Sequence, residues 1–406
     1  MEKRDILFLC QFFYPDHNSS ATLPFDTARS LAAQGFTVDA LVGYPKEYTE
    51  GSDIPLRETA EGVSIRRVPY LQLKRSGTLG RLVNYFSLTF RMLLRLRVLR
   101  GYRCVFVYSN PPILPLLPIL AKRRWGTEFV FVAYDVYPEV AYSSGTLSPD
   151  STISRVMARL NRALYRDAAA VVALTDEMRA FLLAHRPELE AERAVTIANW
   201  AHEQRREPDA AAYARFGYDE GQFVVSYFGN MGTCQDMETL LDAAQLLKDD
   251  AGVRFLIVGH GNKKEAVARR IAQEGLANVQ LLDFLTGKDF EQAVAVSACS
   301  VVSLEKGLMG TCAPSKYYSY LQGGMPVLAV VEKESYLAAE AEGEGIGRAV
   351  EIGDAAGLRD AILALASDRD ACRQMGERAL RLYEERYAYE VAMEKYRRLA
   401  ERVLRK

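Results

Sequence analysis

A lysine stands at the start of a predicted helix in residues 313–328, which read APSKYYSYLQGGMPVL. Pro314 suits the first turn of a helix, and Ser315 can accept hydrogen bonds from free backbone N–H groups. Lys316 adds a positive charge near the positive end of the helix dipole. These residue types predict an anion site that suits a diphosphate. The alternative is an ordinary helix-to-strand unit of an α/β fold.

Three further turns that contain glycine follow predicted strands in the same half of the chain. They are residues 229–233 (GNMGT), 259–262 (GHGN) and 305–307 (EKG). Glycine lets backbone N–H groups approach a ligand closely, and a tight strand-to-helix turn is the alternative explanation for each. Together with the lysine segment they predict a nucleotide-diphosphate site, whose members are Gly229, Gly232, Gly259, His260, Gly261, Glu305, Pro314, Ser315 and Lys316.

In the first half of the chain, two carboxylates follow a predicted strand at 129–133. Asp135 and Glu139 can act as a base toward a hydroxyl group or orient a sugar. The alternatives are a helix cap for Asp135 and a solvated surface position for Glu139. A polar loop after the first predicted strand offers candidate contacts to an acceptor substrate, at His17, Asn18, Ser19, Ser20 and Thr22.

The chain shows no pattern of metal ligands. Its four histidines lack metal-ligand spacing, and no Asp-x-Asp pair follows a predicted strand in the second half. We therefore expect neither a catalytic metal nor another cofactor.

The elements that position these residues are short apolar runs that alternate with helical stretches. Continuous runs of this kind are typical of buried strands in a parallel sheet, so they predict an α/β fold with two doubly wound domains. A polar segment at 199–222 predicts the boundary, which gives domains at 1–199 and 200–387, and a helix at 388–406 ends the chain. The predicted strands are 6–9, 38–42, 104–108, 129–133 and 170–174, then 223–228, 254–258, 279–282, 299–304 and 327–331.

Composition narrows the class of protein. The 406 residues carry a net charge of -1, which argues against general nucleic-acid binding. Six cysteines without a C-x-x-C pair predict reduced thiols and a cytoplasmic location. No apolar run approaches the ~18 to 20 residues of a spanning helix.

Charge is unevenly distributed, however. Residues 62–127 contain no Asp or Glu but thirteen Lys and Arg. Helical spacing places Arg81, Arg91 and Arg95 opposite an apolar face, which Arg97 and Arg100 interrupt at its end. The apolar face consists of Leu79, Leu82, Val83, Phe86, Phe90, Leu93 and Leu94. This pattern favours contact with an anionic membrane surface, and the alternative is a core-packed helix with a solvated basic back. The expected membrane contacts are Arg81, Arg91, Arg95, Arg97 and Arg100.

Five segments in order resemble the nucleotide-sugar domain of the retaining family 4 glycosyltransferases: SYFGNMGTCQDMETLLDAA, FLIVGHGNKKE, NVQLLDFL, PSKYYSYLQGGMPVLAV and GEGIGRAV. The resemblance is greatest to bacterial O-antigen, capsule and colanic-acid sugar transferases, on IANW at 197–200, DVYPE at 135–139 and PSK at 314–316. It implies a GT-B fold, with Rossmann-like domains facing a central cleft and the C-terminal helix packing back on the first domain. Residues 1–199 would bind the acceptor and residues 200–387 the nucleotide-sugar donor.

The chain departs from this family at four positions. Where the family has an Arg and a Lys near the donor phosphates, this chain offers Asn230 and Gln235. Where the family has two glutamates, of which the second holds the ribose, this chain has Thr311 and Ser319. Lys316 is therefore expected to be the main charge on the diphosphate, and Ser319 or Glu305 is expected to hold the ribose.

The resulting hypothesis is a retaining glycosyltransferase of bacterial surface polysaccharide synthesis. It would move a sugar from a UDP-sugar to a polyprenyl-diphosphate-linked saccharide, as a peripheral protein on the inner leaflet of the cytoplasmic membrane, with no nucleic-acid partner. Asp135, Glu139 and Lys316 are the expected catalytic residues. Two alternatives stay open: a nucleotide-sugar epimerase of the same fold, and a catalytically silent GT-B module that binds a nucleotide sugar.

Overall fold

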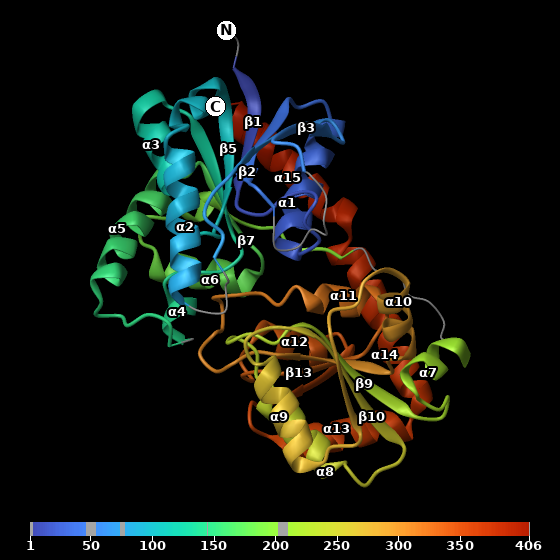
Figure 1. Ribbon diagram of the computed structural model, residues 1–406. Coiled ribbons are helices and arrows are strands. Elements are labelled where there is room, and N and C mark those ends of the chain that lie inside the picture. The colour runs from blue at the N-terminus through green and yellow to red at the C-terminus, as the bar shows by residue number, and fades with distance from the viewer. Residues whose placement is uncertain (1–2, 46–53, 74–77, 144, 202–209, 406) are drawn as a thin grey trace. The chain divides into compact units, whose positions relative to one another are not determined.

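The computed structural model describes residues 3–45, 54–73, 78–143, 145–201 and 210–405 (Figure 1). The chain forms two compact units. Unit 1 contains Met1–Asn199, Gly310–Ala313 and Glu390–Lys406, and unit 2 contains Trp200–Met309 and Pro314–Tyr389. The segment Gly310–Ala313 was expected in the second domain, but it is grouped with unit 1.

Unit 1 is built on an eight-stranded sheet with the order β3-β4-β2-β1-β5-β6-β7-β8. Every neighbouring pair is parallel except β3 and β4, which are antiparallel. The strand order reverses between β1 and β5, where ligands bind in doubly wound folds. The strands are β1 Arg4–Cys10, β2 Val38–Gly43, β3 Arg57–Ala60, β4 Val63–Val68, β5 Tyr102–Tyr108, β6 Glu128–Ala133, β7 Ala170–Ala173 and β8 Ala194–Thr196.

The helices of unit 1 bury apolar residues against this sheet. One core cluster joins Leu88 and Met92, Leu117 and Leu164 to strand residues such as Val107. The helices are α1 Ser19–Ala33, α2 Thr78–Leu93, α3 Leu116–Trp125, α4 Glu139–Ser143, α5 Thr152–Asp167 and α6 Asp176–His185, with short 3₁₀ turns at Leu96–Gly101 and Ala191–Arg193.

The last helix, α15 Tyr389–Leu404, is grouped with unit 1 from Glu390 onward. Its Tyr396 ring lies 6.5 Å from the Phe106 ring of β5, measured between centroids. Arg103 donates a hydrogen bond to the carbonyl of Leu404. These contacts lie within unit 1.

Unit 2 is built on a six-stranded parallel sheet with the order β11-β10-β9-β12-β13-β14. The order reverses between β9 and β12, so the carboxyl ends of these two strands mark the expected ligand position. The strands are β9 Phe223–Asn230, β10 Val253–His260, β11 Val279–Leu282, β12 Cys299–Ser303, β13 Val327–Val330 and β14 Gly347–Val350.

Unit 2 has its own core, which includes Phe223, Phe255 and Leu328 from strands and Leu241 and Ile362 from helices. Its helices are α7 Ala210–Phe216, α8 Glu238–Leu246, α9 Lys264–Glu274, α10 Gly287–Val296, α11 Lys316–Gln322, α12 Tyr336–Gly343, α13 Ala355–Ser367 and α14 Arg369–Leu382, followed by a π-helical turn at Tyr383–Tyr387.

The prediction of two doubly wound α/β sheets is confirmed, and each of the ten predicted strands is present. Four further strands, β3, β4, β8 and β14, were not predicted. β8 and β14 are only three and four residues long, and β4 interrupts its apolar residues with charged ones.

Candidate functional site

In unit 2 the turns after β9 and β10 are in close backbone contact. A side chain at Gly259 would overlap the carbonyl group of Gly229, and one at Gly261 would overlap the carbonyl group of Met231. Both glycines also have positive φ angles, +154° and +139°. These two glycines therefore allow the turns to pack together, which accounts for their presence without a ligand.

The turn after β9 is held in shape by its own side chains. The Gly232 N–H donates a hydrogen bond of 3.0 Å to Oε1 of Gln235. Asn230 is exposed, and its carbonyl accepts a hydrogen bond of 2.8 Å from the Tyr227 hydroxyl. The Gly232 N–H, predicted to face a ligand, is thus engaged by Gln235.

Lys316 lies beside this turn. Its Nζ donates hydrogen bonds to the Tyr227 hydroxyl and, at 3.4 Å, to the Asn230 carbonyl. It also lies 3.8 Å from the centroid of the Tyr227 ring. Burial lowers the pKa of Lys316 to about 7. Among the described residues no carboxylate forms an ion pair with Lys316, so its charge is balanced only by neutral oxygens and a ring face.

The expected capping by Ser315 is wrong. Ser315 precedes α11, but its side chain makes no capping hydrogen bond. α11 has only seven residues, so its dipole would add little to an anion site. Pro314 is buried, and Ser319 lies partly exposed on α11.

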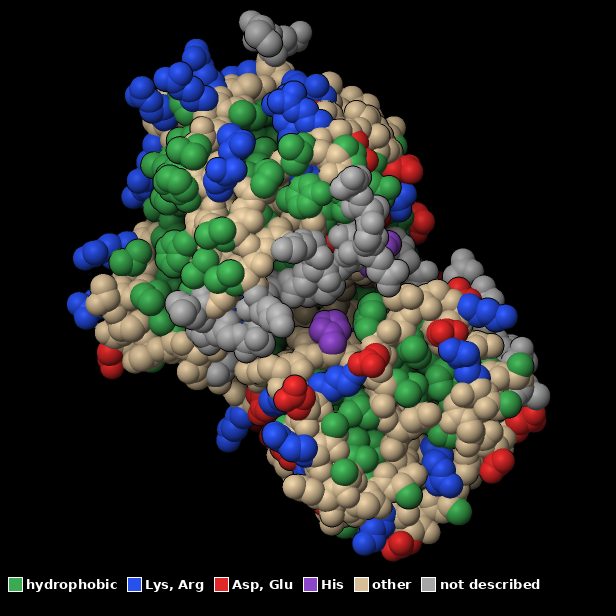
Figure 2. Space-filling model, in the orientation of Figure 1, with side chains coloured by type: hydrophobic (Ala, Val, Ile, Leu, Met, Phe, Trp, Pro, Cys, Tyr) green, Lys and Arg blue, Asp and Glu red, His purple; other side chains and the backbone are tan. Residues whose placement is uncertain are grey.

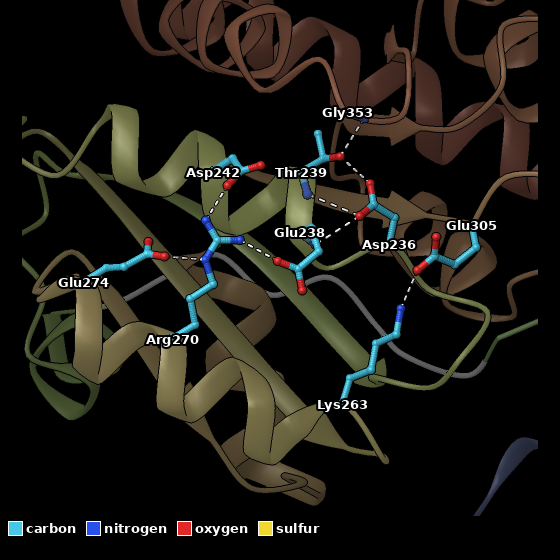
Figure 3. Close-up of polar contacts among 9 residues, drawn as sticks. All are labelled: Asp236, Glu238, Thr239, Asp242, Lys263, Arg270, Glu274, Glu305 and Gly353. Atoms are coloured by element: carbon cyan, nitrogen blue, oxygen red, sulfur yellow. Dashed lines mark hydrogen bonds and ion pairs between the residues drawn. The ribbon is translucent and has the colours of Figure 1, made fainter. Parts of the chain in front are cut away.

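A second lysine, which the sequence analysis missed, reaches the same turn (Figure 3). Nζ of Lys263 donates a hydrogen bond of 2.6 Å to the Gln235 carbonyl and forms an ion pair with Glu305. The Glu305 N–H donates to the Cys234 carbonyl at 2.9 Å. The turns that follow β9, β10 and β12 are therefore tied together by this ion pair and by several hydrogen bonds.

Figure 3 also shows a separate ion network on neighbouring helices. Arg270 of α9 contacts Glu238 and Asp242 of α8 and Glu274 of its own helix. Asp236 is buried and accepts hydrogen bonds of 3.0 and 3.2 Å from the N–H groups of Glu238 and Thr239. These contacts hold the start of α8 beside the turn and leave no free charge on Arg270.

His260 is exposed at the end of β10. Its ring meets that of Phe284 edge to face, with centroids 5.6 Å apart. Phe284 is 52% exposed, which is unusual for a large aromatic side chain. The pair offers an accessible ring surface near the end of β11.

In unit 1, Asp135 follows β6. Its backbone N–H donates to Oγ of Ser109 at 3.1 Å, and its backbone pairs with Cys312 in an isolated antiparallel bridge. Burial raises the pKa of Asp135 to about 6. α4 begins at Glu139, so Asp135 does not cap it.

Glu139 lies in a different environment, because Arg186 holds its carboxylate. Nη2 of Arg186 donates to both carboxylate oxygens, at 2.6 and 2.7 Å. The Arg186 side chain is 11% exposed and the Glu139 side chain 24%. Both carboxylate oxygens of Glu139 are therefore engaged within unit 1.

The loop before α1 contains the predicted acceptor contacts. Asn18 occupies the N-cap position without a capping hydrogen bond, and within the described chain its side-chain oxygen and nitrogen are buried without partners. His17 and Ser19 are exposed, whereas Ser20 and Thr22 are partly buried. No described hydrogen bond joins this loop to Asp135.

The basic stretch folds mainly into α2 and the 3₁₀ turn after it. Leu88 and Met92 are buried, whereas Phe86, Phe90 and Leu94 are 59%, 59% and 66% exposed. Arg91, Arg97 and Arg100 are exposed, and Arg81 and Arg95 are partly buried. Figure 2 shows Lys and Arg side chains interspersed with hydrophobic ones on the visible face of unit 1.

The described residues contain neither a metal-ligand cluster nor a membrane-spanning helix. No group of three or more His, Cys, Asp or Glu side chains there could hold a metal ion. None of the helices described is long and apolar enough to span a membrane.

Two family models match the chain. Residues 25–200 match the glycosyl transferase 4-like domain, and residues 222–368 match the glycosyl transferases group 1 domain. The chain belongs to the glycosyltransferases that combine these two domains. The family resemblance drawn from the sequence is thereby confirmed.

Two curated relatives are similar to this glycosyltransferase. WbjE of Pseudomonas aeruginosa, named as a glycosyltransferase, is 28% identical over 243 residues, which cover 59% of this chain and 60% of WbjE. WcaI of Escherichia coli K12, named as a colanic acid biosynthesis glycosyl transferase, is 23% identical over 369 residues, or 86% of this chain and 90% of WcaI.

Solved structures confirm the GT-B fold of the glycosyltransferase. Sucrose-phosphate synthase from Thermosynechococcus elongatus matches with a TM-score of 0.76 at 15% identity, covering 99% of this chain and 100% of that one. HepE of Anabaena in complex with UDP matches with a TM-score of 0.72 at 16% identity, covering 98% and 100%.

Proposed function

We propose that this protein is a retaining glycosyltransferase that moves a sugar from a UDP-sugar to a polyprenyl-diphosphate-linked saccharide in bacterial surface polysaccharide synthesis. The observation that carries the proposal is Lys316. Its ammonium group lies beside the turn after β9, with a pKa lowered to about 7 by burial, and no described carboxylate pairs with it. A diphosphate would supply the missing counter-charge.

The choice of donor rests on unit 2 and on its relatives. A diphosphate at Lys316 lies at the carboxyl ends of the strands, where the order reverses and nucleotides bind in such sheets. HepE, which shares the fold, binds UDP. The ring surface of His260 and Phe284 suits a stacked base, since every base has an apolar face.

The chemical step breaks the bond between the anomeric carbon of the sugar and the diphosphate, and forms a bond to an acceptor hydroxyl. Negative charge accumulates on the leaving UDP, and Lys316 stabilises that charge. The hydroxyl loses a proton, for which Asp135 is the assigned base, because a pKa of about 6 leaves it ionised near neutral pH. Glu139 has a positioning role, because its ion pair with Arg186 holds the two segments that carry these residues together.

In this proposal, unit 1 contacts the membrane and binds the acceptor. The exposed side chains of Phe86, Phe90 and Leu94 insert among lipid chains, while Arg91 and Arg97 face anionic headgroups. A lipid-linked saccharide would reach unit 1 from that surface. The loop with His17 and Asn18 would hold its sugar, because Asn18 has a buried donor and acceptor to offer.

Incubation with labelled UDP-sugars and polyprenyl-diphosphate-linked saccharides tests the function. Extension of the lipid-linked glycan with the donor's anomeric configuration supports the proposal. Interconversion of free UDP-sugars without transfer would instead show an epimerase. Binding without turnover for every acceptor would show a catalytically silent module.

A further inference from the structure

We infer that Lys263 and Glu305 are a second set of donor contacts, with Lys263 binding the diphosphate and Glu305 accepting hydrogen bonds from the ribose hydroxyls. The inference rests on the proposed function, because it concerns the same nucleotide site of unit 2. In the free protein the two side chains pair with each other (Figure 3). In the complex each exchanges its partner for the nucleotide.

Two lysines lie close to the turn after β9. Residues 230–235 form the turn after β9, and a lysine contacts each end of it. Lys316 donates to the Asn230 carbonyl at 3.4 Å, and Lys263 donates to the Gln235 carbonyl at 2.6 Å. Residues 229–236 contain no Lys or Arg, so any cation at this turn must come from another element.

The backbone fixes Lys263 beside this turn. Its N–H donates a hydrogen bond of 3.0 Å to the Met231 carbonyl. Gly261 permits the approach, since any side chain there would overlap the same carbonyl group. Lys263 is therefore held against the turn whether or not its side chain pairs with Glu305.

Lys263 and Glu305 are accessible enough to exchange each other for a ligand. The side chains of Lys263 and Glu305 are 25% and 36% exposed, and an ion pair open to water is weak and easily exchanged. Arg270 provides the contrast, because three carboxylates surround it. A phosphate oxygen offers Lys263 a charge-assisted hydrogen bond in place of the carboxylate.

Glu305 has the chemistry that a ribose contact requires. A ribose presents two hydroxyl donors, for which a carboxylate is the natural acceptor. α11, which begins at Lys316, contains no carboxylate in its sequence KYYSYLQ. Glu305 is anchored by its N–H to the Cys234 carbonyl, and release from Lys263 frees both of its oxygens.

The test measures binding of UDP, uridine and 2′-deoxy-UDP by calorimetry to the full chain and to Lys263→Gln, Glu305→Gln and the double variant. Lys264→Gln is the matched control, because Lys264 pairs with Asp283, whose side chain is 98% exposed. Thermal unfolding of each variant checks that it folds.

We expect Lys263→Gln to weaken UDP binding about tenfold and to leave uridine binding unchanged. Glu305→Gln should weaken UDP and uridine about tenfold but leave 2′-deoxy-UDP unchanged. Equal losses for all three ligands in both variants, or no losses, would overturn the inference in favour of a purely structural ion pair. Failure of the unaltered protein to bind UDP would instead overturn the proposed function.

Discussion

The two units have the same strand order around their first strands but carry opposite ionisable groups. In unit 2, burial lowers the pKa of Lys316 to about 7, and in unit 1 burial raises the pKa of Asp135 to about 6. Both groups lie beyond the ends of parallel strands, and neither has an ion pair among the described residues. Two sheets of similar topology therefore place a lysine with a lowered pKa in one unit and an aspartate with a raised pKa in the other.

Other charged side chains in each unit have ion-pair partners. Glu139 has Arg186, and Arg270 has three carboxylates, so both are satisfied within the fold. Paired charges of this kind hold neighbouring segments of the chain together. The unpaired groups, Lys316 and Asp135, have capacity left for a substrate.

The largest effect should come from replacing the cation. Lys316→Met removes the charge that stabilises the leaving diphosphate, and we expect kcat/KM for transfer to fall about 10³-fold. Steady-state assays with labelled donor measure this, with Lys248→Met, an exposed lysine of the same unit, as control. Activity within threefold of the unaltered enzyme would show that Lys316 does not stabilise the leaving diphosphate.

Replacing the base should have a smaller effect and a different signature. Asp135→Asn keeps the shape but cannot accept a proton, so kcat should fall about 10²-fold while UDP affinity stays unchanged. In the unaltered enzyme kcat should fall as the pH drops below about 6, because a base with its pKa raised to about 6 is then protonated.

The variant should lack this acid limb. A pH profile that keeps the same limb in Asp135→Asn would assign the base to another residue.

Binding to anionic vesicles tests whether the basic surface of unit 1 contacts a membrane. Neutralising Arg91, Arg95 and Arg97 to Gln should weaken binding to phosphatidylglycerol vesicles about 100-fold, at about 1 kcal/mol per cation. Cosedimentation measures this, and Phe86→Ser with Phe90→Ser should weaken it further. Unchanged binding by both variants would remove the membrane from the account.

The smallest effect should be the loss of stability on replacing Asp236. Asp236→Ala removes hydrogen bonds to the N–H groups of Glu238 and Thr239, so the free energy of unfolding of unit 2 should fall by about 1 kcal/mol. Urea unfolding followed by circular dichroism measures it. A loss of UDP binding without a loss of stability would show that Asp236 contacts the ligand.

The sequence predicted the parts of the fold that depend on local pattern. Continuous apolar runs such as residues 104–108 and 223–228 gave strands in both units. The hairpin of β3 and β4 was missed because Arg66 and Arg67 interrupt its apolar residues. Arg67 is in fact buried and paired with Glu58, a pairing that no local pattern shows.

The site was predicted in part for the same reason. Lys316 stood out because its neighbours are unusual in sequence. Lys263 did not, because its partners Gln235 and Glu305 lie 28 and 42 residues away and are brought together only by the sheet. The grouping of Gly310–Ala313 with unit 1 also depends on tertiary contacts, such as the hydrogen bond from the Val136 N–H to the Thr311 carbonyl.

Calorimetric titration of UDP-glucose between pH 6 and pH 9, in buffers of different ionisation enthalpy, tests whether Lys316 binds the donor diphosphate. Free Lys316 has a pKa of about 7, and a bound diphosphate should raise it. We expect the protein to take up protons when UDP-glucose binds above pH 7. The affinity should be greatest below pH 7 and fall as the pH rises. Both effects should be lost in Lys316→Met. Affinity that is independent of pH, with no proton uptake, would contradict this role of Lys316.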